Sequence, residues 1–216
     1  MSSQYYSRVR ANKAKRALRK KKAFKKFQPR PMTTRRVKQI VKGMAEKKYK
    51  HLDYDTTFDQ VGTFYPLANI AAGDAQEQRE GDTIQVTRVD LHYRVTKADN
   101  SNTVRIIVFS KKGNAVPANL SEILESTSQY GIISEYNHER TYPFKVYYDK
   151  CVTVNADKDV SPVFNHSIPL NLRLKYTGVN ATDYGDCNLW MVILSDSGAA
   201  THPSVIFRAI THYVDI

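Results

Sequence analysis

The sequence has few cysteines and no long apolar run, and both absences limit what the protein can be. Its 216 residues include two cysteines, Cys151 and Cys187, too few for a disulfide framework or a cysteine-rich zinc site. We therefore expect a reducing compartment. No run of about 18 apolar residues is present, which argues against an ordinary membrane span. The polar, basic N-terminus has no apolar core of the kind found in secretory signals.

Motifs of the common enzyme classes are also missing. The sequence contains no Gly-x-x-x-x-Gly-Lys phosphate loop, no Gly-x-Ser-x-Gly elbow and no His-Glu-x-x-His motif. The six histidines are scattered along the chain, at His51, His92, His138, His166, His202 and His212. We predict a protein that is not an enzyme, with no catalytic residues and no cofactor.

Two groups of acidic residues are candidate metal ligands. Asp53, Asp55 and Asp59 lie close together in the sequence, and so do Asp183 and Asp186. Hard cations such as calcium take carboxylate oxygens as ligands. Structural calcium is therefore one interpretation, and a solvated loop is the simpler one. The residues alone leave the metal question open.

Acidic residues are nearly absent from the first fifty positions. Residues 1–50 contain 19 Lys and Arg and one acid, Glu46, which gives a charge of +18. Residues 51–216 contain 14 Lys and Arg and 20 Asp and Glu, which gives −6. Blocks of like charge resist compaction and usually serve as interaction tails. We therefore divide the chain into a basic arm, residues 1–50, and a folded body, residues 51–216.

The arm predicts binding to a polyanion. Nucleic acid is the preferred partner, because each neutralised phosphate releases condensed counterions. We assign nucleic-acid binding to Arg8, Arg10, Lys13, Lys15, Arg16, Arg19, Lys20, Lys21, Lys22, Lys25, Lys26, Arg30, Arg35, Arg36, Lys38 and Lys42. Basic clusters of this kind also act as nuclear localisation signals. A membrane surface is disfavoured because the arm lacks a broad apolar face. A solubilising tail without a partner is the remaining alternative.

Two helices are expected in the arm. Residues 11–27 are rich in good helix formers, and counter-charge would relieve their mutual repulsion, so this helix should fold on binding. A second helix is predicted over about 35–48, capped by Thr33 or Thr34. Its apolar face has helical spacing and consists of Val37, Ile40, Val41 and Met44. An ordinary surface helix is the alternative for this segment.

Beyond residue 50 the apolar pattern changes to period two, which is typical of strands. We predict about eight strands, over 56–65, 83–96, 104–109, 132–141, 144–154, 170–176, 189–194 and 204–214. The apolar phase slips by one residue within 83–96, which predicts a bulge near Thr87–Arg88. One short helix is expected at 119–126, where Ser121 can cap. This pattern indicates an all-β antiparallel sandwich or barrel.

A glycine-rich motif precedes the strand at 83–96. It contains Gly73, Arg79, Gly81 and Ile84, and the glycines permit a tight turn before the strand begins. With a basic arm and eight strands, this motif resembles the capsid proteins of circular Rep-encoding single-stranded DNA viruses, the circovirus-like group. That layout is similar also to coat proteins of the satellite tobacco necrosis virus type. Ala72 departs from the motif, because the family often has Gln there.

The resemblance implies an eight-stranded antiparallel jelly roll of the viral capsid type, made of two four-stranded sheets. It implies self-assembly into a T=1 shell of sixty copies that packages single-stranded nucleic acid, in particular circular DNA, against the inward arm. Subunit contacts would come from loops and strand ends, including the aromatic-rich 130–148 region. The implied locations are the virion and, during assembly, the host nucleus. The implied partners include a nuclear import receptor and a host surface receptor, but no membrane.

Two other classes of protein compete with this interpretation. A cellular single-stranded nucleic-acid-binding protein with a β-barrel should carry basic and aromatic residues on its sheet face, whereas this body is acidic. A ribosomal-type protein with a basic extension would usually carry positive charge on the body as well.

Overall fold

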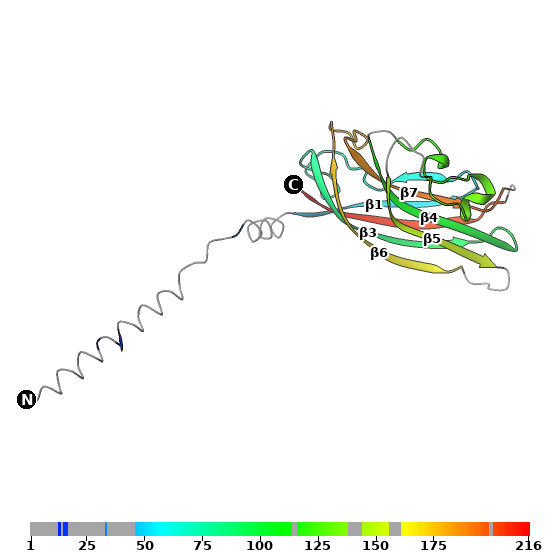
Figure 1. Cartoon of the computed structure of the whole chain (residues 1–216), viewed down its shortest axis with the longest axis horizontal. Helices are drawn as coiled ribbons and strands as arrows, with labels where there is room; N and C mark the ends of the chain where they lie inside the picture. The colour runs from blue at the N-terminus through cyan, green and yellow to red at the C-terminus, as the bar shows by residue number, and fades with distance from the viewer. Residues whose placement is uncertain are drawn as a thin grey trace, which may run out of the picture. The chain divides into compact units, whose positions relative to one another are not determined.

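The body folds into eight β-strands and two short 3₁₀ helices. In a computed structural model (Figure 1), the described residues are 46–113, 116–137, 144–155, 161–198 and 201–216, together with Lys13, Lys15, Arg16 and Thr33. The strands are β1 (Lys47–Thr57), β2 (Thr63–Pro66), β3 (Thr83–Thr96), β4 (Ser101–Lys112), β5 (Phe144–Asn155), β6 (Val163–Lys175), β7 (Cys187–Ser195) and β8 (Ser204–Asp215). The 3₁₀ helices are η1 (Leu120–Glu122) and η2 (Ser128–Ile132).

The strands form two antiparallel sheets whose order departs from the order of the chain. The first sheet has the order β1-β8-β3-β6, and the second has the order β2-β7-β4-β5. Most neighbours within a sheet are therefore distant in sequence. Two four-stranded sheets joined by such crossovers form a jelly roll, and the predicted fold class is confirmed.

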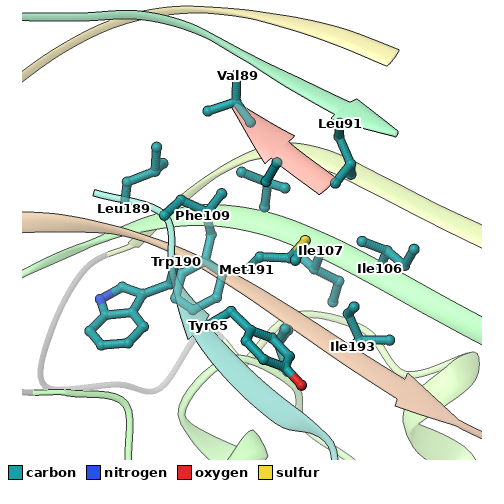
Figure 2. Close-up of a cluster of buried hydrophobic side chains, with 14 of the residues drawn as sticks. Tyr65, Val89, Leu91, Ile106, Ile107, Phe109, Leu189, Trp190, Met191 and Ile193 are labelled. Atoms are coloured by element: carbon teal, nitrogen blue, oxygen red, sulfur yellow. The ribbon is translucent and has the colours of Figure 1, made fainter. Parts of the chain in front are cut away.

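Side chains that alternate along the strands meet between the two sheets. In β3, Ile84 and Val86 are buried on one parity and Val89 and Leu91 on the other. The register of β3 against both neighbouring strands shifts between Val86 and Arg88, which confirms the predicted bulge. Figure 2 shows a cluster of buried side chains from β2, β3, β4 and β7.

β4 and β7 are buried on both faces. Every residue from Val104 to Lys111 is buried, and so is nearly all of β7, as the continuous apolar run at 189–194 predicts. One face of each strand meets the first sheet. The segment between β4 and β5 covers the other face, because η2 packs against β4 and β7.

Arg105 anchors this covering segment to the outer face of the second sheet. Its Nη1 donates to the carbonyl oxygens of Gly131 at 2.9 Å and Ser134 at 2.8 Å. Its Nε and Nη2 donate to the two carboxylate oxygens of Asp149 at 2.9 and 2.7 Å. A single buried guanidinium therefore joins β4, β5 and the segment between them.

Two predictions for the segment are wrong. In place of a helix over 119–126, the chain forms the single 3₁₀ turn η1, with Asn119 rather than Ser121 at its N-cap position. In place of a strand over 132–141, Tyr136 forms one isolated bridge with Leu124, and residues 138–141 lie outside the described part. Within the predicted strand, the carbonyl oxygen of Ser134 accepts a hydrogen bond from Arg105 instead of from a neighbouring strand.

The predicted strand over 56–65 is two strands separated by a turn. β1 ends at Thr57 and β2 begins at Thr63. Asp59 accepts hydrogen bonds from the backbone N–H groups of Val61 and Gly62 at 3.0 and 3.2 Å. Gly62 has a φ of 79°, a conformation that favours glycine. A continuous strand is incompatible with this turn.

β1 begins earlier than the charge division implies. Lys47 and Lys48 end the predicted helix over 35–48, yet they pair in register with Val214 and Tyr213 of β8. The body therefore includes residues 47–50, which the charge division assigns to the arm. Residues 35–45 lie outside the described part of the chain.

Lys48 is held at the start of β1 by carboxylates that are distant in sequence. Its side chain is 0% exposed, and its Nζ lies 2.7 Å from Glu80, 3.4 Å from Asp215 and 4.0 Å from Glu46. Burial favours a lower pKa for Lys48, but hydrogen bonds to Glu80 and Asp215 outweigh it and raise that pKa. Lys48 is therefore a structural cation and is unavailable to bind phosphate.

Removal of the Arg105 guanidinium should destabilise the body strongly. We expect Arg105→Leu to lower the free energy of unfolding by about 3 kcal/mol, because Asp149 loses its cationic partner and several buried carbonyl groups lose their donor. Urea unfolding followed by the fluorescence of the single tryptophan, Trp190, would measure it.

Arg208→Leu is the matched control, since Arg208 makes the same two-pronged contact with Asp53. That pair is 59% and 52% exposed, whereas the Arg105–Asp149 pair is 8% and 25% exposed. Exposed pairs contribute little, so the midpoint should hardly move. Equal effects in the two variants would contradict the anchoring role.

Acid should destabilise the start of β1. Hydrogen bonds from Lys50 and His51 lower the pKa of Glu77 below its ordinary 4.5, although burial opposes this. A lowered folded-state pKa contributes stability that is complete above about pH 4.5 and is lost as the pH falls through the folded value. We expect Glu77→Gln to flatten the fall of the melting temperature between about pH 5 and pH 3. Circular dichroism melts would measure it, and an unchanged slope would contradict this role for Glu77.

Candidate nucleic-acid interface

Most of the arm residues predicted to bind nucleic acid lie outside the described part of the chain. Lys13, Lys15 and Arg16 are described, and all three are helical and exposed, in line with the helix predicted over 11–27. The other thirteen basic residues assigned to the interface are not described. Their role stays a prediction.

The glycine motif forms a structural clamp at the start of β3. Arg79 is 1% exposed, and its guanidinium donates to carbonyl oxygens of Ile70 at 3.2 Å and Gly81 at 2.8 Å, and to that of Gly178. The same group lies 4.2 Å from the centre of the Tyr176 ring. Arg79 therefore joins the loop before β3 to the loop that follows β6. It does not face solvent and is no candidate for phosphate binding.

Gly73 is required by the same clamp. Its φ is 152°, a backbone conformation that residues with a side chain rarely adopt. Its N–H donates to the carbonyl oxygen of Arg79 at 2.9 Å. The motif thus serves the fold, and its tight turn is confirmed.

The outer face of the first sheet, the face turned away from the second sheet, is the uncovered face of the sandwich. Its side chains alternate with the buried positions of β1, β3, β6 and β8. Within the described residues, no segment comparable to 116–137 packs on it. Six exposed cations lie on this face: Lys47, Arg88, Arg94, Arg173, Lys175 and Arg208. Three carboxylates accompany them: Asp53, Asp55 and Asp90. This face is cationic, although residues 51–216 as a whole carry −6.

Part of this positive charge is already neutralised by ion pairs. Asp90 accepts hydrogen bonds from Arg88 at 3.0 Å and from Ser167 at 2.7 Å, and its Oδ2 lies 2.8 Å from Nε2 of His212. Burial opposes the shift, but the bonds from Ser167 and Arg88 lower the pKa of Asp90. Asp90 therefore stays ionised and orients Arg88 and His212 at the β3 bulge.

Four cations of this face are available to a ligand. Across the described part of the chain, no ion pair is formed by Lys47, Arg94, Arg173 or Lys175. Exposed, unpaired Lys and Arg side chains are the groups that neutralise phosphates. Sequence reasoning missed them because their convergence depends on strand register, and no local pattern marks it.

The acidic clusters do not converge into a metal site. Asp53 is bound by Arg208, Asp59 caps the turn between β1 and β2, and Asp183 accepts the backbone N–H of Asn180 at 2.9 Å. In the portion of the chain that is described, no group of three or more His, Cys, Asp or Glu side chains is placed to hold a metal ion. Structural calcium stays a prediction.

Among the described residues, no helix combines the length and the apolar character needed to cross a bilayer.

Comparison with solved structures gives matches of low similarity, and two of them are virus structures. The Desmodium yellow mottle tymovirus structure aligns with 88% of this chain and 93% of its own, with 8% identity and a TM-score of 0.40. The infectious bursal disease virus Gx strain structure aligns with 80% of this chain and 33% of its own, with 8% identity and a TM-score of 0.33. At such TM-scores the fold assignment rests on the strand order itself.

Sequence comparison gives a more specific result. The coat protein of Satellite tobacco necrosis virus 2 is 37% identical over 105 residues, which are 47% of this chain and 51% of that protein. The match thus spans about half the length of that relative. A family model described as the satellite tobacco necrosis virus coat protein matches residues 18–216.

These matches support one of the two resemblances drawn from the sequence and give no support to the circovirus-like one. The matches to coat proteins also confirm the expectation that this is a structural protein rather than an enzyme. Because the family model covers nearly the whole chain, the protein belongs to the satellite tobacco necrosis virus coat protein family.

Proposed function

We propose that the protein is the coat subunit of a small virus and assembles into a closed shell around single-stranded nucleic acid. The observation that carries the proposal is the separation of charge along the chain, +18 on residues 1–50 and −6 on residues 51–216. A cationic arm can neutralise a packaged polyanion, while an acidic, folded jelly roll can form the wall. Family membership supports the coat role, and the virion is the corresponding location.

The proposed shell contains sixty identical copies in T=1 symmetry. Because residues 47–50 belong to the body, the arm is residues 1–46, with 16 Lys and Arg and one Glu and a charge of +15. Sixty such arms would supply about 900 positive charges, each able to offset one phosphate. This suits a genome on the order of one to two thousand nucleotides, with small cations neutralising the remainder. Many weak contacts summed over a closed, symmetric assembly give tight packaging without sequence recognition.

The outer face of the first sheet is the proposed wall surface toward the genome. It carries unpaired Arg94, Arg173 and Lys175, whereas the opposite side of the sandwich is covered by residues 116–137. Subunit contacts are proposed at the covering segment, where Tyr130 is 57% and Ile133 80% exposed. Exposed apolar side chains of this kind often mark contacts between proteins.

Finer features of the proposal come from the resemblance. They are a circular single-stranded DNA genome, nuclear import through the basic clusters and a host surface receptor, and they rest on the circovirus-like resemblance alone. Digestion of the packaged nucleic acid with DNase or RNase would identify its sugar.

The second candidate function is a cellular single-stranded nucleic-acid-binding protein. Its expected feature is a sheet face with both basic and aromatic residues, and the unpaired cations of the first sheet supply the basic part. The two functions differ in assembly, because only the coat function requires closed particles.

Assembly should be visible directly. Negative-stain microscopy of the purified full chain with single-stranded nucleic acid should show uniform closed particles, because a coat subunit repeats the same contacts under closed symmetry. A monodisperse monomer under all salt and nucleic-acid conditions would contradict the coat function and favour the cellular one.

Loss of the arm should uncouple folding from packaging. We expect deletion of residues 1–30 to leave the body folded, because its core and clamps lie beyond Glu46. The nucleic acid in purified particles, measured by ultraviolet absorbance relative to protein, should fall sharply.

Two full-length variants serve as controls for charge. Replacement of Arg19, Lys20, Lys21, Lys22, Lys25 and Lys26 by Gln should reduce packaging at constant length, since phosphate contacts are lost. Exchange of the five lysines among them for Arg should leave it unchanged. Equal packaging by the deleted, neutralised and wild-type chains would show that the arm is not the packaging element.

A further inference from the structure

A shallow groove crosses one end of the outer face of the first sheet. Its volume is about 890 Å³, within the range of ligand sites, about 300–1,000 Å³. All four strands contribute to its walls. The lining residues that matter here are Arg94 and His92 of β3, Val163 of β6, and Ile206, Arg208 and Ile210 of β8.

Register places these residues side by side. Asp55, Ile206, Arg94 and Val163 are direct neighbours across the sheet, and Asp53, Arg208, His92 and Asn165 form the adjacent row. The groove is therefore a property of the sheet surface. Its shape depends on regular strands rather than on mobile loops.

The floor of the groove is apolar. Ile206 and Ile210 flank Arg208 on the same face of β8, and Val163 lies at the β6 side. Val163 is 65% exposed and Ile206 is 38% exposed. Covering this apolar surface removes it from water, which is favourable, so the floor suits a flat, partly apolar ligand.

The rim of the groove carries oriented polar groups. Arg94 is exposed and has no ion-pair partner in the described part of the chain, whereas Arg208 is fixed by Asp53 at 2.8 and 2.9 Å. The Nδ1 atom of His92 lies 2.6 Å from Oδ1 of Asn165. The lining holds two arginines and two carboxylates, and Asp53 already pairs with Arg208. Arg94 is therefore the cation that a phosphate can contact, and the apolar floor beside it suits an uncharged ring.

We propose that this groove binds unpaired nucleotides of a single-stranded nucleic acid. Bases lie on Ile206, Ile210 and Val163, and the adjacent phosphate contacts Arg94. Asp55 is an acceptor for an exocyclic amino group, as carboxylates are for cytosine. The proposal rests on the proposed packaging function and deepens it, since it makes the wall of the shell selective for unpaired bases. In a duplex the base faces are stacked and cannot reach the floor.

Photo-crosslinking of the full chain tests the proposal. The probe is a single-stranded RNA oligonucleotide that contains 4-thiouridine, compared with the same strand in a duplex. After irradiation, we expect crosslinked peptides that contain His92 or Ile206 with the single strand and none of them with the duplex. Crosslinks to the arm should occur with both probes, because phosphate contacts do not distinguish them.

Variants separate base contact from general binding. Val163→Gln combined with Ile206→Gln should reduce groove crosslinking about fivefold, in line with the loss of a base contact, and should leave arm crosslinking unchanged. Val179→Gln is the matched control, because Val179 is a 71% exposed valine outside the groove, and it should have no effect.

The other possible outcomes would overturn either the groove proposal or the packaging function. Groove crosslinks that are absent from the wild type, or equal for single strand and duplex, would overturn the groove proposal and leave the packaging function standing. Absence of crosslinks to every part of the wild-type chain would overturn the packaging function itself. If the double variant changes the sedimentation of nucleic-acid-free protein but not its crosslinking, the groove is a contact between copies, and the proposal is wrong.

Discussion

The buried guanidinium of Arg105 holds the segment that covers one side of the sandwich. A jelly roll has two outer faces, and this chain covers the second sheet with its own segment between β4 and β5. That segment has little regular hydrogen bonding, and its carbonyl groups at Gly131 and Ser134 are satisfied by Arg105. Because Asp149 neutralises the same cation, the anchor can be buried, and the first sheet is left as the exposed face.

The charges of the body are distributed unevenly between its two sides. Residues 51–216 are acidic as a whole, yet unpaired cations such as Arg94 and Arg173 collect on the exposed sheet. The interior cations Lys48, Arg79 and Arg105 have a different role, since each is buried and bound to carboxylates or carbonyl groups. Positive charge in this body is therefore divided between clamps that hold loops to strands and a face that can meet a polyanion.

Regular alternation made the strands predictable, while loops that depend on distant contacts were not. β3 and its bulge follow from apolar residues alone, because one face of the strand must be buried. The segment at 119–141 was assigned a helix and a strand from local pattern, but distant Arg105 binds its carbonyl groups. Likewise, Lys47 and Lys48 look helical and basic in sequence, whereas pairing with β8 makes them strand.

The sequence by itself determined the all-β class, the separation of a basic arm from an acidic body and the location of the tight turn at Gly73. Each of these depends on composition or short-range spacing, which the chain carries locally. Only the tertiary structure decided which sheet stays exposed, which cations are free and that Ile206, Arg94 and Val163 form one groove. These depend on register between strands more than forty residues apart, because hydrogen bonding between distant segments, rather than local pattern, places side chains in one row.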